Sequence, residues 1–186
     1  MVLDELWKFL KNPVYQIDSN TSIKYKVFFL LKLLVLSLTV NIALSIIIGG
    51  VLSSLDLELG KHAIETLFNN YSYTFILFAA VILAPILEEL LFRGPMFFFR
   101  KSSNFRFFFY LFTLAFGFYH IINYEITPAI LALSPLLVAP QILVGAFMGF
   151  IRIRLGLVWA MLLHASYNLV LVGSVILLKA SEISLE

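Results

Sequence analysis

Long apolar runs separated by short polar connections dominate the chain. The runs are about as long as an α-helix must be to cross the hydrocarbon core of a bilayer, roughly 20 residues. They cover residues 27–51, 71–99, 107–122, 128–151 and 155–178. The pattern predicts an all-α, polytopic transmembrane helix bundle of about five spans.

The first 20 residues follow a different pattern. Leu3, Leu6, Trp7 and Leu10 recur at helical spacing, and two lysines lie off this stripe. Such a segment is typical of a short helix lying in the membrane interface, although a frayed amphipathic tail fits the pattern equally well. No apolar core with a small-residue cleavage site is present, so the sequence shows no signal peptide.

Composition supports a membrane protein. Hydrophobic residues make up 61% of the 186 residues and charged residues only 13%, with a mean hydropathy of +0.99. No polar region is long enough to fold separately, so we expect a single domain over residues 1–186. Cysteine is absent, which excludes disulfides and thiolate nucleophiles. The net charge is only +2 and the basic residues are few, so we expect no nucleic-acid partner.

The basic residues indicate an orientation. Most precede or open the first run, or lie between the second and third or the fourth and fifth: Lys8, Lys11, Lys24, Lys26, Lys32, Arg93, Arg100, Lys101, Arg106, Arg152 and Arg154. Only Lys61 and Lys179 fall on the other side. Because flanking positive charge is retained in the cytoplasm, this predicts a cytoplasmic N-terminus and an outside C-terminus.

Prolines interrupt two of the runs. Pro135 and Pro140 lie within 128–151, where each removes a backbone donor and favours a break. Pro85 and Pro95 bracket the charged stretch of the second run. We therefore expect a broken fourth span and a distorted helix around that stretch.

The charged stretch carries Glu88, Glu89 and Arg93 inside an otherwise apolar run. Ionised residues cost about 2.5–3.5 kcal/mol at mid-membrane on insertion scales and normally face a partner or a cavity. Glu89 and Arg93 are four residues apart, so the spacing predicts an ion pair that fixes helix packing. Glu88 points elsewhere and is the better candidate for chemistry.

Two histidines complete the candidate set. Counted from the nearest cytoplasmic charge at about 1.5 Å per residue, Glu88, His120 and His164 lie at similar depths. His164 and Asn168 share a helical face. A carboxylate and a histidine can activate water while a second histidine and an amide stabilise an oxyanion. The same Glu88, His120 and His164 could instead hold a divalent metal such as zinc, and the residues alone do not decide between no cofactor and a metal.

Two familiar hydrolase patterns are missing. The sequence contains no His-Glu-x-x-His string, which excludes the usual zinc-protease helix. It also contains no Gly-x-Ser-x-Gly string, which disfavours a serine nucleophile.

Three motifs, met in order, resemble those of the CAAX-type prenyl endopeptidases and bacteriocin-processing membrane proteins, the CPBP or Abi family of intramembrane proteases. Glu88, Glu89 and Arg93 fit E-E-x-x-x-R; Phe116 and His120 fit F-x-x-x-H; His164 and Asn168 fit H-x-x-x-[ND]. The motif core spans about 84–168.

The resemblance implies a bundle of transmembrane helices around a catalytic cavity. Glu88 and His120 would activate water, His164 and Asn168 would form the oxyanion hole, and Glu89, Arg93 and Phe116 would support the site. It further implies a peptide or membrane-protein segment as substrate and, for a chain this compact, an integral protein of a prokaryotic cell (inner) membrane. Few spans precede the first motif, which leaves a homo-oligomer open as a way to complete the cavity.

Two other functional classes compete with a protease. A non-catalytic peptide-binding or bacteriocin-immunity protein would keep the fold without turnover. A proton-coupled carrier would use Glu88 as its titrating group, but the sequence shows no inverted repeat to rock about a central site. The protease hypothesis is preferred because a binder has little reason to keep three costly polar positions at one depth.

Overall fold

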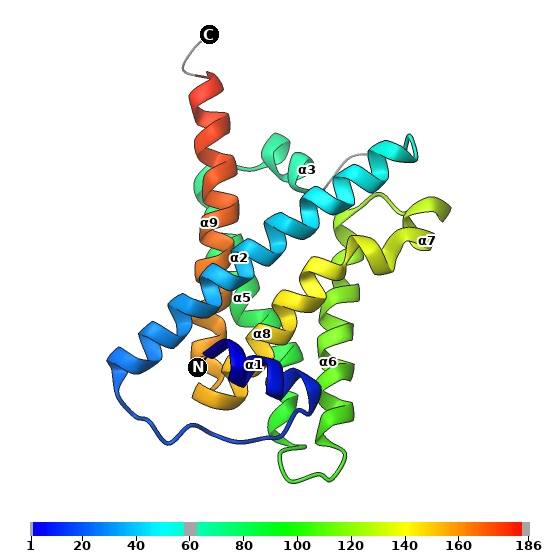
Figure 1. Ribbon diagram of the computed structural model, residues 1–186. Coiled ribbons are helices and arrows are strands. Elements are labelled where there is room, and N and C mark those ends of the chain that lie inside the picture. The colour runs from blue at the N-terminus through cyan, green and yellow to red at the C-terminus, as the bar shows by residue number, and fades with distance from the viewer. Residues whose placement is uncertain (1, 58–62, 184–186) are drawn as a thin grey trace.

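The computed structural model describes residues 2–57 and 63–183, and every regular element in these ranges is helical (Figure 1). In chain order the elements are α1 (Val2–Lys11), α2 (Ile23–Ser54), α3 (Ala63–Asn70), α4 (Tyr73–Phe78), the π-helical turn η1 (Ala79–Leu83), α5 (Ala84–Phe92), the 3₁₀ turn η2 (Pro95–Phe97), α6 (Phe105–Tyr119), the 3₁₀ turn η3 (His120–Asn123), α7 (Pro128–Leu137), α8 (Ala139–Leu155) and α9 (Leu157–Ile183).

Five helical segments in the described residues are long and apolar enough to cross a membrane, which confirms the predicted bundle. They are Ile23–Ser54, Tyr73–Phe97, Phe105–Asn123, Pro128–Leu155 and Leu157–Ser181. Their ends lie within about four residues of the predicted boundaries. The chain is therefore an integral membrane protein, and the single-domain boundary at 1–186 stays a prediction.

Helix α8 forms the centre of the bundle. The segment from Val144 to Ile153 is buried throughout, and α2, α6 and α9 pack around it. In Figure 1, α8 runs between α2 and α6. Gly156, with φ of 106°, ends α8 in a backbone conformation that side chains rarely adopt and lets α9 begin one residue later.

The prolines break the spans as predicted, with one correction. The fourth span divides at Val138 into α7 and α8. In the second span the distortion lies before Pro85, as the π-helical turn η1, and at Pro95, as the 3₁₀ turn η2. The expectation that the helix itself is distorted around the charged stretch was wrong, because Glu88 and Glu89 lie on regular α5.

The N-terminal segment is an ordered helix, so the frayed-tail interpretation was wrong. In α1, Leu6 is buried against the bundle, whereas Leu3 and Trp7 are both 61% exposed. The segment that follows crosses the end of the bundle, where the Asp18 backbone N–H donates to the Arg154 carbonyl. Placement of α1 in a membrane interface stays a prediction.

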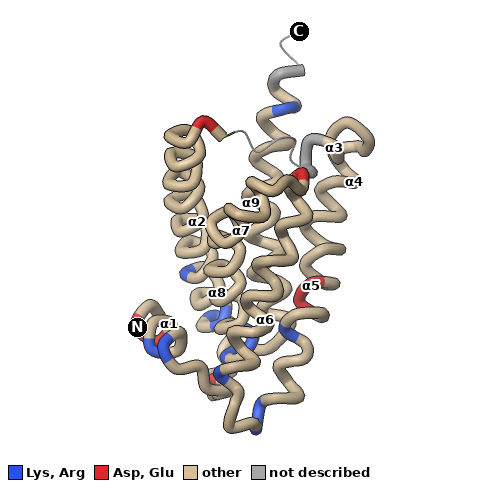
Figure 2. Tube along the Cα trace, turned by 90° about the vertical axis from the view of Figure 1, so that its right-hand side faces the viewer, with Lys and Arg blue, Asp and Glu red and all other residues tan. Residues whose placement is uncertain are grey.

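Lys and Arg gather at the end of the bundle that carries α1 (Figure 2). Lys179, on α9, lies toward the opposite end. Lys61, the other residue expected there, lies outside the described residues. The cytoplasmic assignment of the α1 end and of the N-terminus stays a prediction.

Candidate active site

Glu89 forms the predicted ion pair with Arg93 in the interior. Their side chains are fully buried, and Arg93 Nη1 lies 3.1 Å from Glu89 Oε1. Arg93 Nη2 donates to the Gly145 carbonyl at 3.0 Å, and the guanidinium lies 3.8 Å from the centre of the Phe116 ring. The contacts of Arg93 with Gly145 and Phe116 hold the end of α5 against α8 and α6. A buried pair that loses one partner leaves an uncompensated charge, so the loss of either Glu89 or Arg93 would be costly.

Two features of α8 allow Arg93 to reach this position. Gly145 leaves the necessary room, since a Cβ there would lie 2.7 Å from the Phe116 ring and 3.1 Å from Arg93 Nη2. About two helical turns beyond Gly145, buried Arg152 donates from Nε to the Arg93 backbone carbonyl at 3.3 Å. This places a cation at the carboxyl end of α5, where the helix dipole favours positive charge.

His164 extends the ion pair toward the cavity. Its Nδ1 lies 3.0 Å from Glu89 Oε1, and the side chain is nearly fully buried. An ionised carboxylate only accepts hydrogen bonds, so Nδ1 carries the proton when Glu89 is ionised. The other ring nitrogen, Nε2, lies 3.8 Å from Glu88 Oε2.

His120, the first residue of η3, approaches the same carboxylate from the end of α6. Its Nδ1 donates to the Phe116 carbonyl at 2.8 Å, because a carbonyl oxygen can only accept. A neutral His120 therefore has its lone pair on Nε2, which lies 3.8 Å from Glu88 Oε2. The Phe116 ring packs edge-on against both imidazoles, with centroids 4.7 Å from His120 and 5.8 Å from His164. Phe116 thus sets the orientation of both rings.

Glu88 is the point on which the two histidines converge, at the common depth that the sequence predicts. Its Oε2 is buried and takes part in no hydrogen bond with the described residues. The distance of 3.8 Å to each Nε2 is too long for a direct hydrogen bond and suits a bridging water.

Asn168 lies one turn beyond His164 on α9 and donates from Nδ2 to the Ala80 carbonyl at 2.8 Å. The reason lies in the π-helical turn. In its i→i+5 register the Ala80 carbonyl would accept from residue 85, and Pro85 has no N–H. Asn168 supplies the missing donor, which ties α9 to the second span and leaves its second amide hydrogen available.

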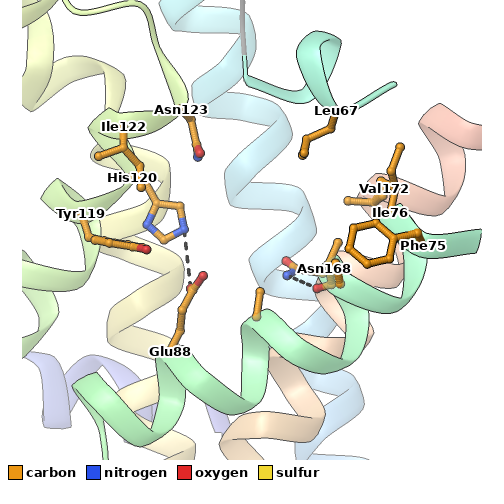
Figure 3. A pocket seen from close by; sticks show the side chains of 13 residues that line it. Leu67, Phe75, Ile76, Glu88, Tyr119, His120, Ile122, Asn123, Asn168 and Val172 are labelled. Carbon is orange, nitrogen blue, oxygen red and sulfur yellow. Dashed lines mark hydrogen bonds and ion pairs between the residues drawn. The ribbon is translucent and has the colours of Figure 1, made fainter. Parts of the chain in front are cut away.

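A cavity of about 360 Å³ opens beside these groups. Glu88 and His120 point toward one another across it, and Asn168 lies on its far wall (Figure 3). Most of the remaining lining is apolar and includes Phe75 and Ile76. The cavity therefore combines one small polar cluster with a surface suited to apolar side chains.

The three side chains considered as metal ligands, Glu88, His120 and His164, do meet. In the part of the chain that the structure describes, however, no group of three or more Asp, Glu or His side chains is placed so as to hold a metal ion. The choice between a metal and no cofactor stays a prediction, and the function proposed below uses the side chains alone.

The comparison with known families addresses the resemblance. The family described as type II CAAX prenyl endopeptidase, Rce1-like, matches residues 70–170, more than half of the chain. The chain belongs to this family. The match includes α5, α6, α8 and all seven predicted site residues, and membership supports a CAAX-type intramembrane protease in general. No curated protein and no solved structure gives a significant match.

The structure also brings polar residues near the site of this CAAX-family protein that the sequence analysis missed. Asn41 from α2, Gln141 from α8 and Tyr167 from α9 line a second cavity that includes His120 and His164. Gln141 could have been singled out from the sequence, because it is an amide inside an apolar run and directly follows Pro140. Asn41 could have been singled out in the same way, as an amide within the first run.

Proposed function

We propose that this chain is an intramembrane endopeptidase that hydrolyses a peptide bond with water activated by Glu88 and His120. The observation that carries the proposal is the position of Glu88 Oε2. It is buried, has no hydrogen bond with the described residues and lies 3.8 Å from the Nε2 atoms of two histidines on other helices.

The activation step follows from the two acceptors. A water between them donates one hydrogen bond to the Glu88 carboxylate and the other to His120 Nε2, which directs an oxygen lone pair outward. As that oxygen bonds to the substrate carbonyl carbon, its proton passes to Glu88. Glu88 then gives the proton to the amide nitrogen as the carbon–nitrogen bond breaks. General acid–base catalysis of this kind contributes about 10²–10⁴-fold.

His164 and Asn168 are proposed to stabilise the oxyanion. His164 Nδ1 donates to Glu89, and a proton on Nε2 lets the same ring donate toward the oxyanion as well. Protonated His164 donates from Nε2, and Asn168 donates the amide hydrogen that Ala80 does not use. Each such donor is worth about 10²–10³-fold in turnover.

The substrate is proposed to be a peptide or a segment of a membrane protein. The cavity beside Glu88 presents Phe75, Ile76 and Val172 opposite the polar cluster. An apolar side chain next to the scissile bond would fill this surface and exclude bulk water, which strengthens the electrostatic contacts at the site.

The test is terminal-peptide proteomics of membranes from matched cells that express the wild type, Glu88→Gln or Glu125→Gln at equal levels. Glu125 is exposed and lines neither cavity, so it controls for the change in charge. The proposal predicts new peptide termini with the wild type and Glu125→Gln that are missing with Glu88→Gln. Identical profiles from all three would contradict it and favour a peptide-binding or immunity protein.

A further inference from the structure

A second cavity, of about 260 Å³, lies against the other side of the candidate site. Both cavities include His120, Asn123, Asn168 and Val172 in their lining. The first is closed by the second span, whereas the second is closed by α2 and α8. The shared residues of η3 and α9 therefore form a partition between them.

The second cavity is lined by hydrogen-bonding side chains from α2, η3, α8 and α9. They are Asn41, His120, Asn123, Gln141, His164, Tyr167 and Asn168. We name this cavity the Gln141 chamber. The rest of its lining is apolar, and it contains no Lys, Arg, Asp or Glu. The lining therefore matches a small neutral polar ligand better than an ion.

Gln141 gives independent evidence for such a ligand. Its Oε1 is buried and accepts no hydrogen bond from any of the described residues. Burying an amide without a partner costs roughly 1–3 kcal/mol in proteins, and no bulk water is present in the hydrocarbon region to satisfy it. A polar, roomy cavity with several convergent partners is a site where water is stably bound.

We propose that the Gln141 chamber is filled with water and supplies the water that Glu88 and His120 activate. Only the second claim, that this water is the one activated by Glu88 and His120, rests on the proposed function. At about 30 Å³ for each molecule the chamber holds several waters. Substrate would occupy the cavity beside Glu88, and water would reach the partition from the side of α2 and α8. His120 is one of the four residues that line both cavities, and it is the one proposed to bind the reacting water.

The natural absence of cysteine allows a direct test by single-cysteine accessibility. Asn41→Cys places a thiol in the chamber, and Ile42→Cys places one at the next position of α2, which is 55% exposed on the outside of the bundle. Both proteins would be reconstituted in phosphatidylcholine vesicles and treated with 2-aminoethyl methanethiosulfonate. Because the thiolate is the reactive form and needs water to ionise, Asn41→Cys should react at least about tenfold faster.

A second pair keeps the test decisive if Asn41→Cys does not fold. Val175→Cys lies in the chamber wall on α9, and Leu177→Cys, at a position that is 72% exposed, faces outward from the same helix. The chamber predicts faster labelling of Val175→Cys. Equal, slow labelling of the chamber and outward positions in a folded pair would overturn the proposal.

Labelling is read without turnover, so the loss of proteolysis and the loss of the water chamber are separate results. If a cleaved substrate is identified, Gln141→Leu should lower kcat with KM unchanged, because the water supply is altered and the substrate cavity is not. A rise in KM with kcat unchanged would contradict the role in water supply and leave the labelling result standing.

Discussion

Two neighbouring glutamates of α5 meet opposite surroundings. Glu89 is fully buried and shares its Oε1 between Arg93 and His164. Glu88, one residue earlier and rotated by about 100° around the helix, is 18% exposed and faces a cavity with two imidazoles at 3.8 Å. The same side chain thus lies in a buried ion pair in one position and beside a cavity in the other, where we propose that it exchanges a proton with water.

The largest expected effect on stability comes from breaking the Glu89–Arg93 pair. Arg93→Met leaves Glu89 as an uncompensated buried charge and should lower the free energy of unfolding by about 3–5 kcal/mol. Thermal unfolding in detergent would measure the change, with Arg106→Met, at an exposed arginine, as the control. Similar unfolding midpoints for both variants would show that the Glu89–Arg93 pair does not stabilise the fold.

A smaller effect is expected from Gly145→Ala. The added Cβ meets the Phe116 ring at 2.7 Å and Arg93 Nη2 at 3.1 Å, and overpacking of this kind typically costs 1–3 kcal/mol. Gly173→Ala on α9 is the matched control, because the nearest atom to its Cβ, on Leu169, lies 3.9 Å away. Unfolding curves should separate the two variants, and an unchanged midpoint for Gly145→Ala would mean that Phe116 and Arg93 can shift freely.

The smallest effect is expected at Asp18, outside the spans. Burial raises the pKa of Asp18. Hydrogen bonds from the Tyr25 hydroxyl and the Asn20 backbone N–H, together with the nearby charge of Arg154, lower it by more, so the pKa lies below its usual value. A lowered carboxyl pKa stabilises the fold above the unfolded-state value, about pH 4, and this contribution is lost as the pH falls through the folded-state pKa.

Asp18→Asn should therefore lower stability by less than about 1 kcal/mol at pH 7 and flatten the acid side of the stability profile. Unfolding midpoints between pH 7 and pH 3 would measure this. A profile of the variant that runs parallel to the wild type would show that the Asp18 contacts contribute nothing.

Much of this architecture follows from local sequence patterns. Five apolar runs of bilayer length predict the spans, and Pro135 and Pro140 predict the break between α7 and α8. The i,i+4 spacing predicts the Glu89–Arg93 pair, since both residues lie on one helix. Similar depths along antiparallel helices predict that Glu88, His120 and His164 meet.

Contacts between distant segments could not be predicted in this way. At the π-helical turn Pro85 has no N–H to offer the Ala80 carbonyl, and Asn168, 88 positions away from Ala80, donates to it instead. The contact of Arg152 with the end of α5 requires the position of α8. Gln141 and Asn41 become informative only once α2 and α8 are seen to enclose one cavity.

The central claim is the division of roles between Glu88 and Glu89, and the most direct measurement compares Glu88→Gln with Glu89→Gln. Each purified variant would be assayed for its unfolding midpoint and for cleavage of a substrate identified by terminal proteomics. We predict that Glu88→Gln keeps the wild-type midpoint and loses cleavage by about 10²-fold or more, whereas Glu89→Gln lowers the midpoint. Retained cleavage by a folded Glu88→Gln protein would contradict the account.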